Sequence, residues 1–371
     1  STNDPDSNQH PNDHDYAQLV SIYTHLDEVP VDDGGGGNQR STPSTESPSF
    51  GKIVSITPSA DNVSGIAISA TNQDDIEAFV LGVAGAGGAA VAVSAAVNII
   101  SANTEAYIGS NAQINTTGSP ADGQSVIVGA ANDFRHIAVS GALAVSGGGS
   151  VAPAVDVTVL TNTTSARIDG GAVVNADDDV IVTADAAEDI LLVGVGIAGG
   201  LVGFGGAVGV LIVNNTTEAK VGGNITAGGN VFVSANDDTD VLVIDGAVGA
   251  GLAGIGVSVG VIDLNKNTTA AVLNGAIVNA RGIGTGSTVL NGTMSGTDAD
   301  PTGFNTTTAK GLTVQAMSSE EVYHFAFAIG AGWVGLAGGI LVTDVASNTL
   351  AYIGNAAVNQ TGNGSAAGGQ D

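Results

Sequence analysis

Carboxylates recur at one position of an internal repeat. They lie four or five residues after the alanine that closes a short apolar motif, and they are Asp74, Asp75, Glu188, Asp189, Asp240, Glu320 and Glu321. Arg135 takes the equivalent position in the second copy. If the copies stack, like charges about 5 Å apart repel by about 1 kcal/mol per pair in water. A hard cation removes this repulsion, and calcium, with about six to eight oxygen ligands, is the metal that we expect.

A solvated turn is the competing interpretation of these acidic residues, and we favour it. Asp and Asn suit the backbone of turns without any ligand. The Gly-Gly-x-Gly-x-Asp motif of known calcium-binding repeats does not recur in this chain. Calcium is therefore the one cofactor that the sequence suggests.

The elements that would position these carboxylates belong to a degenerate repeat. A strand-like motif ending in alanine occurs at residues 66–70, 126–130, 180–184, 231–235 and 312–316. An Asn/Thr-rich motif, which we align on its terminal alanine, follows at 103–106, 162–166, 215–219, 267–271 and 348–351. The two alanines of a copy are 35 or 36 residues apart, whereas the connection to the next copy varies from 16 to 45 residues. A constant block with one variable loop is typical of stacked repeats.

The constant block predicts strands rather than helices. Its two apolar legs are rich in β-branched residues, and glycine interrupts them every two to four positions, at about 1 kcal/mol each in a helix interior. We therefore expect an all-β fold, a parallel β-solenoid (β-helix) of about five degenerate repeats over residues 51–371. The copies begin near residues 65, 125, 179, 230 and 311, and an insertion occupies 282–310. Whether a repeat makes one rung or several coils stays open.

The core of such a solenoid must be thin. Only 4% of the residues are aromatic and 56 are glycine, so Val, Ile, Leu and Ala fill the interior between closely spaced backbones. The apolar legs lack polar alternation, which predicts strands covered on both faces, inside a layered solenoid or against another subunit. The last copy ends within its variable loop without a polar cap. This predicts head-to-tail stacking of chains, or excision from a longer array.

Residues 1–50 differ from the rest and predict a flexible acidic and polar tail. A Gly run at 34–37 acts as a linker. Tyr16, Leu19, Tyr23 and Leu26 fall at helical spacing, which indicates a docking segment, and a disordered leader is an equal alternative.

Composition excludes several classes of function. The formal net charge of −28 removes the attraction that nucleic acid requires. The chain has no cysteine and scatters its five histidines, so it offers no thiolate chemistry and no zinc constellation. Glycine patterns at 194–199 and around Ser258 resemble a dinucleotide fingerprint and a nucleophile elbow, but both fall in the repeated legs and indicate scaffold. Residues 190–213 are uncharged, yet equivalent legs carry Asp156 and Asp245, which disfavours a membrane span.

The unit of Gly/Ala legs, then Asn-Thr-Thr-x-Ala, then Val-x-Val-x-Ala resembles the repeats of large bacterial filamentous adhesins, including the leukotoxin-like ones. The resemblance covers residues 65–360. It implies a secreted right-handed β-solenoid displayed at the cell surface, and it carries over no catalytic residue.

We therefore expect a non-enzymatic, extracellular structural or adhesive protein that assembles head-to-tail with itself and contacts glycans or a neighbouring cell surface. A monomeric carbohydrate-binding or surface-binding β-helix is the alternative, and a polysaccharide-active β-helix enzyme is a weaker one. Such an enzyme needs basic and acidic groups together, and only eight basic residues are present.

Overall fold

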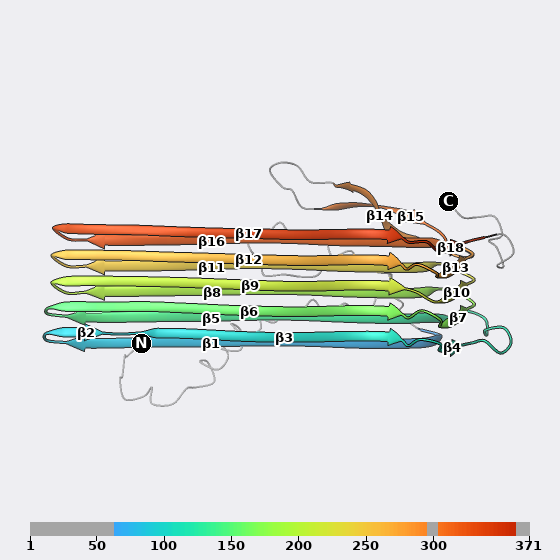
Figure 1. The fold of residues 1–371 in the computed structure, drawn as a ribbon, viewed down its shortest axis with the longest axis horizontal. Coiled ribbons are helices and arrows are strands. Elements are labelled where there is room, and N and C mark those ends of the chain that lie inside the picture. Colours follow the sequence, from blue (N-terminus) through green and yellow to red (C-terminus); the bar gives the residue numbers. More distant parts are fainter. Residues whose placement is uncertain (1–62, 295–302, 361–371) are drawn as a thin grey trace, which may run out of the picture. The chain divides into compact units, whose positions relative to one another are not determined.

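The computed structural model describes residues 63–294 and 303–360, so the tail at 1–50 and its docking segment lie outside the described residues. The described chain is all-β, as predicted, and its three stacked sheets are parallel. Each repeat forms one rung of a flat solenoid, and five rungs stack (Figure 1). This settles the number of coils per repeat at one.

A rung consists of a long outgoing strand, a two-residue turn, a long return strand and a short closing strand. The outgoing sheet contains β1 (Gly65–Ala86), β5 (Ser125–Ser146), β8 (Val180–Gly199), β11 (Val231–Ala250) and β16 (Leu312–Ala331). The return sheet contains β2 (Ala89–Val91), β3 (Ser94–Ile108), β6 (Gly149–Ile168), β9 (Val202–Val221), β12 (Ala253–Val272) and β17 (Val334–Ile353). The closing sheet contains β4 (Gln113–Ile114), β7 (Val173–Ala176), β10 (Asn224–Ala227), β13 (Ile277–Ala280) and β18 (Ala357–Val358).

The repeat alanines mark the register of the stack. Those of the outgoing strands pair in one column, which is Ala70, Ala130, Ala184, Ala235 and Ala316. Those of the return strands form a second column, which is Ala106, Ala166, Ala219, Ala270 and Ala351. Our alignment of Ala271 with this column was wrong by one residue. Two consecutive alanines cannot fix a register, and the column is set instead by which of them points inward.

The core becomes thinner from the closing sheet toward the turns. Near the closing sheet it is filled by Val, Ile and Ala from all three sheets. Toward the turns it is reduced to alanines such as Ala142, Ala144, Ala152 and Ala154, together with glycine. The outgoing and return sheets approach closely there, because a Cβ added at Gly196 would collide with backbone carbonyl oxygens of the opposite sheet.

The insertion between the fourth and fifth rungs contains an antiparallel hairpin. It is formed by β14 (Ser287–Met294) and β15 (Phe304–Ala309). Val289 of this hairpin packs on Ile181 and Phe232, which point outward from the outgoing sheet. The next rung keeps its register despite the insertion, since Ala235 pairs with Ala316.

Gly196→Ala should destabilise the solenoid by about 1–3 kcal/mol or more, because the added methyl group forces the two sheets apart. The measurement is urea unfolding followed by far-ultraviolet circular dichroism. Gly199→Ala is the matched control, since a Cβ at Gly199 in the same strand meets open space. Equal midpoints for the two variants would show that the sheets are not tightly apposed.

Candidate functional site

The predicted acidic residues stack, but they divide between the two faces of the outgoing sheet. The outer column contains Asp75, Arg135, Asp189, Asp240 and Glu321. The inner column contains Asp74, Phe134, Glu188, Thr239 and Glu320. Consecutive residues of a strand point to opposite faces, so two adjacent carboxylates in one copy cannot share a site. The seven residues therefore form two neighbouring columns and not one cluster.

The outer column is a carboxylate ladder with one cation in it. The Nη1 atom of Arg135 lies 2.9 Å from Oδ1 of Asp75 and 3.2 Å from Oε1 of Glu77. Burial, followed by the charge of Asp240, raises the pKa of Asp189 to about 7, and Arg135 opposes this rise. Neutral pH thus falls within the titration of Asp189.

One further acidic residue of this face was not among the predicted set. Asp238 lies two residues before Asp240 on the outer face of β11, and burial together with the charge of Asp240 raises its pKa to about 6. The run of acidic residues at 237–240 was the signal for it in the sequence.

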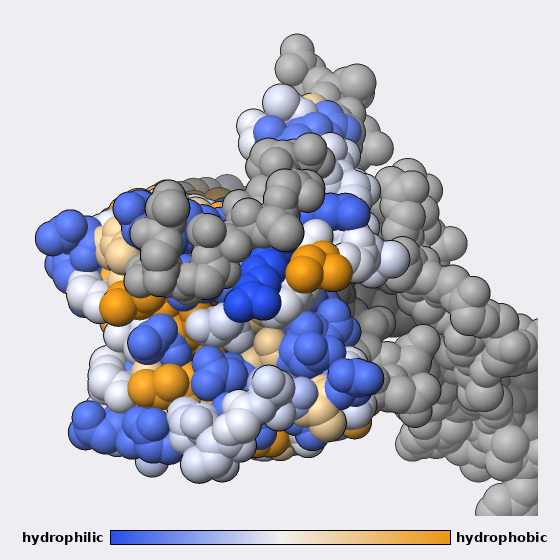
Figure 2. Space-filling model, turned by 90° about the vertical axis from the view of Figure 1, so that its right-hand side faces the viewer, coloured by the Kyte–Doolittle hydropathy of each residue, from blue (hydrophilic) through white to orange (hydrophobic). Residues whose placement is uncertain are grey.

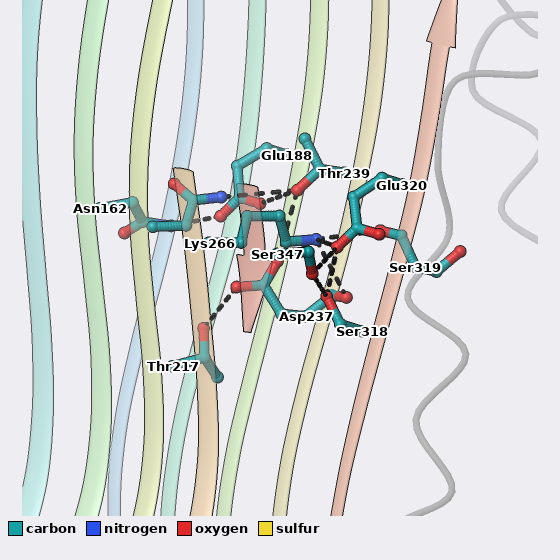
Figure 3. Close-up of polar contacts among 11 residues, drawn as sticks. Asn162, Glu188, Thr217, Asp237, Thr239, Lys266, Ser318, Ser319, Glu320 and Ser347 are labelled. Carbon is teal, nitrogen blue, oxygen red and sulfur yellow. Dashed lines mark hydrogen bonds and ion pairs between the residues drawn. The ribbon is translucent and has the colours of Figure 1, made fainter. Parts of the chain in front are cut away.

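The inner column leads into a buried network centred on Lys266, which sequence reasoning missed (Figure 3). The Nζ atom of Lys266 lies 2.7 Å from Oδ1 of Asp237 and 3.2 Å from Oε1 of Glu320. It also donates to the carbonyl oxygens of Asp237 and Ser319 at 3.3 and 2.9 Å. The side chains of Lys266 and Asp237 have no exposed surface. Lys266 was recognisable as a charged residue at an inward position immediately before the fourth Asn/Thr-rich motif.

Glu188 lies beside this ion pair and accepts two hydrogen bonds. Asn162 Nδ2 donates to its Oε1 at 2.5 Å, and Thr239 Oγ1 donates to its Oε2 at 2.8 Å. Burial and then the charge of Asp237 raise the pKa of Glu188 well above its usual range. Burial favours a higher pKa for Glu320. The charge of Lys266 and hydrogen bonds from neighbouring hydroxyl groups outweigh this effect, so the pKa is lowered.

These groups form a network that links four rungs, from β6 to β17, with Lys266 and Asp237 buried inside and Ser347 at the exposed end of the stack. Thr217 donates to Oδ2 of Asp237 at 2.8 Å, and Ser347 donates to Oε1 of Glu320 at the same distance. A substrate cannot reach Lys266 without opening the sheets, because its side chain is fully buried. The arrangement satisfies buried charge and is suited to fixing register rather than to catalysis.

The Asn/Thr-rich motifs supply a threonine ladder on the inside of the return sheet. Its members are Thr104, Thr164, Thr217, Thr268 and Thr349. The first four of these point into the interior with little exposure. This complete threonine column therefore has a packing role, as expected for stacked side-chain ladders.

Two more buried carboxylates lie nearer the turns. Asp156 and Asp245 are fully buried. Burial raises the pKa of Asp156 to about 6, which a hydroxyl contact with Thr158 opposes. Burial and the charge of Asp156 raise the pKa of Asp245 to about 7. Glycine makes room for Asp245, since a Cβ added at Gly209 would overlap its carboxylate.

Other sequence patterns resolve into scaffold. The glycine pattern at 194–199 lies within strand β8, and Ser258 is a buried inward residue of β12. His136 contacts the carbonyl oxygen of Ile76 and the hydroxyl of Thr158 at 3.0 and 3.2 Å, as a packed interior side chain.

No protein-family model, curated protein or solved structure matches this chain. Within residues 63–294 and 303–360, no group of three or more His, Asp or Glu side chains is arranged to hold a metal ion. The calcium site at Asp74, Asp75, Glu188, Asp189, Asp240, Glu320 and Glu321 stays a prediction. The same described ranges contain no helix able to cross a membrane.

Stability should fall as the pH rises from about 4 to about 7. A raised carboxyl pKa means that the folded state holds its proton more tightly, so this stabilisation is complete below the ordinary value of about 3.9. It is lost as the pH passes the folded-state value, about 7 for Asp189. Asp189→Asn should reduce the slope of the urea midpoint against pH. Asp122→Asn, which removes one charge from an exposed loop, should leave the slope unchanged.

Lys266→Met should lower the free energy of unfolding by about 3–5 kcal/mol, because it leaves Asp237 buried without its cation. Lys220→Met is the matched control. Lys220 pairs with Glu218 at 2.6 Å on the partly exposed outer face, and its loss should cost less than about 1 kcal/mol. Urea unfolding measures both, and similar losses would mean that the network does not contribute as a buried unit.

Proposed function

We propose that this chain is a non-enzymatic structural element of an extended β-solenoid displayed outside the cell, as part of a fibre or adhesin. The supporting observation is that the stack is open along its long edges. Within the described residues, β1 and β16 end the outgoing sheet, and β17 ends the return sheet. Every residue of β17 is exposed. Such edges present unpaired N–H and C=O groups that favour the addition of another rung.

The two ends of the stack match in their side-chain columns, which supports addition of a second copy of this chain. Continuing the observed register places the first rung of one copy on the last rung of another. The pairs that result are alike, with Phe325 on Phe79, Val342 on Val97, Thr349 on Thr104 and Tyr352 on Tyr107. Like-on-like stacking already occurs within the five rungs, in the threonine column of Thr104 and the valine column of Val97.

The same register places carboxylates opposite one another at the join. Glu320 would lie on Asp74, and Glu321 would lie on Asp75. At the rung spacing of about 4.8 Å each pair repels by about 1 kcal/mol in water. Salt or a divalent cation such as calcium should therefore favour axial assembly, which gives the acidic columns a role at the junction.

Cysteine cross-linking tests axial stacking directly, because the chain has no cysteine of its own. Ala96 and Leu341 are inward residues of the same column at the two ends of the return sheet. A96C/L341C treated with a short bismaleimide should give a ladder of covalent multimers, and millimolar calcium should increase their yield. A96C/T349C places its second cysteine about 26 Å farther along the strand and should give none.

Negative-stain electron microscopy of the unmodified chain should show rods longer than five rungs under the same conditions. Monodisperse short rods with no cross-linked ladder, with or without calcium, would contradict the fibre proposal. That result would instead favour a monomeric carbohydrate-binding or surface-binding β-helix.

A further inference from the structure

The outer face of the return sheet is apolar and uncharged over the half of each strand that lies next to the turn. We call this surface the return tip face. It comprises four neighbouring columns of outward residues, which are Val91, Val151, Phe204, Ile255 and Leu336; Val93, Pro153, Gly206, Val257 and Gly338; Ala95, Val155, Val208, Val259 and Ile340; and Val97, Val157, Val210, Val261 and Val342. The last column consists of valine in all five rungs, and Val97 and Val342 at its ends are 65% and 52% exposed.

A sheet with one face in water normally directs its large apolar side chains inward, and the strands beneath this face do the opposite. The inward residues there are small, such as Ala152, Ala154, Gly205 and Ala207. The larger apolar side chains point out of the solenoid instead. The outgoing sheet repeats this pattern, with outward columns that include Phe79, Val139, Val193, Ile244 and Phe325. Exposed apolar surface of this extent marks an interaction site.

The exposed charges lie outside the return tip face. Asp156 and Asp245 near the turns are buried, and Asp263 and Asp344 lie in the outward column that borders the valine column. The acidic outer column of Asp75 to Glu321 lies toward the closing sheet, as do Glu105 and Glu218 of the return sheet. At the closing end itself, hydrophilic residues are spread over the surface with separate hydrophobic ones between them (Figure 2). The long strands therefore run from an acidic half to an apolar half.

We propose that the return tip face packs against the return tip face of a second copy, with the two acidic halves pointing in opposite directions. A two-fold axis in the plane of the contact, parallel to the stacking direction of the rungs, gives this arrangement, and it separates charges that a parallel overlap would bring together. Four columns over five rungs cover about 600 Å², so the contact buries about 1,200 Å² in total, the lower end of a stable interface. The outgoing sheet offers the same contact on the opposite side, so lateral association extends beyond a dimer.

A lipid bilayer is the less favourable occupant. Among the described strands, β16 and β17 have no hydrogen-bonded neighbour on their outer edges. Hydrocarbon offers these backbone groups no partner, whereas a protein interface leaves the edges in water. The overall charge of −28 also opposes approach to an anionic membrane surface. This lateral contact uses the faces of the sheets and is independent of axial stacking at their edges.

Val210 is an outward residue of β9 on the return tip face. Val195 is an outward residue of β8 in the corresponding half of the outgoing sheet. Val195→Asp with Val210→Asp should weaken self-association at least about tenfold in sedimentation velocity, since each new carboxylate would be buried without a partner. The unmodified chain should form dimers and larger species, more so at high salt because screening reduces repulsion between copies. Ser69→Asp with Thr216→Asp adds the same two charges to the acidic halves of these faces and should associate like the unmodified chain.

The fluorescence of Trp333 can report whether protein or lipid covers the return tip face. Trp333 is the single tryptophan of the chain and is 93% exposed in the turn before β17. Its emission should shift to the blue with increasing protein concentration and not with phosphatidylcholine vesicles. A shift with vesicles alone would overturn the proposal in favour of a bilayer, and a monomer at every concentration and salt would overturn it outright. Cross-linking of A96C/L341C in the Asp-bearing background reports axial stacking separately, so failure of one contact is distinguishable from failure of the other.

Discussion

Parallel, in-register pairing is the constraint on which the rest of this structure depends. Each residue of a long strand stacks on its counterpart in the next rung, so a side chain is repeated along the axis as a column. Such a column is stable only if neighbouring side chains attract one another, or if a residue of different charge or polarity separates those that repel. The alanine, threonine and valine columns satisfy this rule by size and shape. Arg135, Phe134 and Thr239 separate acidic residues in parts of the carboxylate columns. Where Asp189 and Asp240 are adjacent, burial and the charge of Asp240 raise the pKa of Asp189 to about 7, so protonation relieves the repulsion there.

The spacing between the two sheets follows from the same columns. Glycine and alanine repeated along the axis bring the sheets together near the turns, and Val and Ile hold them apart near the closing sheet. A polar interior of Lys266, Asp237 and Glu188 lies where the core is wide enough to contain long side chains. Asp245 fits farther along only because glycine stands opposite it. The residue type at each position thus sets both the distance between the two sheets and the polarity of the interior there.

The sequence was informative about periodicity and less so about faces. Alanine spacing was enough to predict five stacked repeats and the confined insertion, because those features depend on counting residues along the chain. Ala270 and Ala271 show the limit, since identical neighbours carry no information on which one points inward. The acidic pairs Asp74–Asp75 and Glu188–Asp189 were placed correctly in the stack, but strand alternation divides each pair between interior and surface. Lys266 was missed because its partners lie on the opposite sheet, Asp237 in the same rung and Glu320 in the next, and the apolar legs proved to be exposed on their outer side.

The hairpin of β14 and β15 has a consequence for how such a chain can change. It enters and leaves the stack at one corner, and the rungs on either side keep their register. Segments of different length are therefore interchangeable at that corner without altering the rod beneath them. Segments attached to different rungs are therefore spaced along the solenoid at multiples of about 4.8 Å. New recognition surfaces can be acquired there by lengthening a single loop, while the stability of the rod is inherited unchanged.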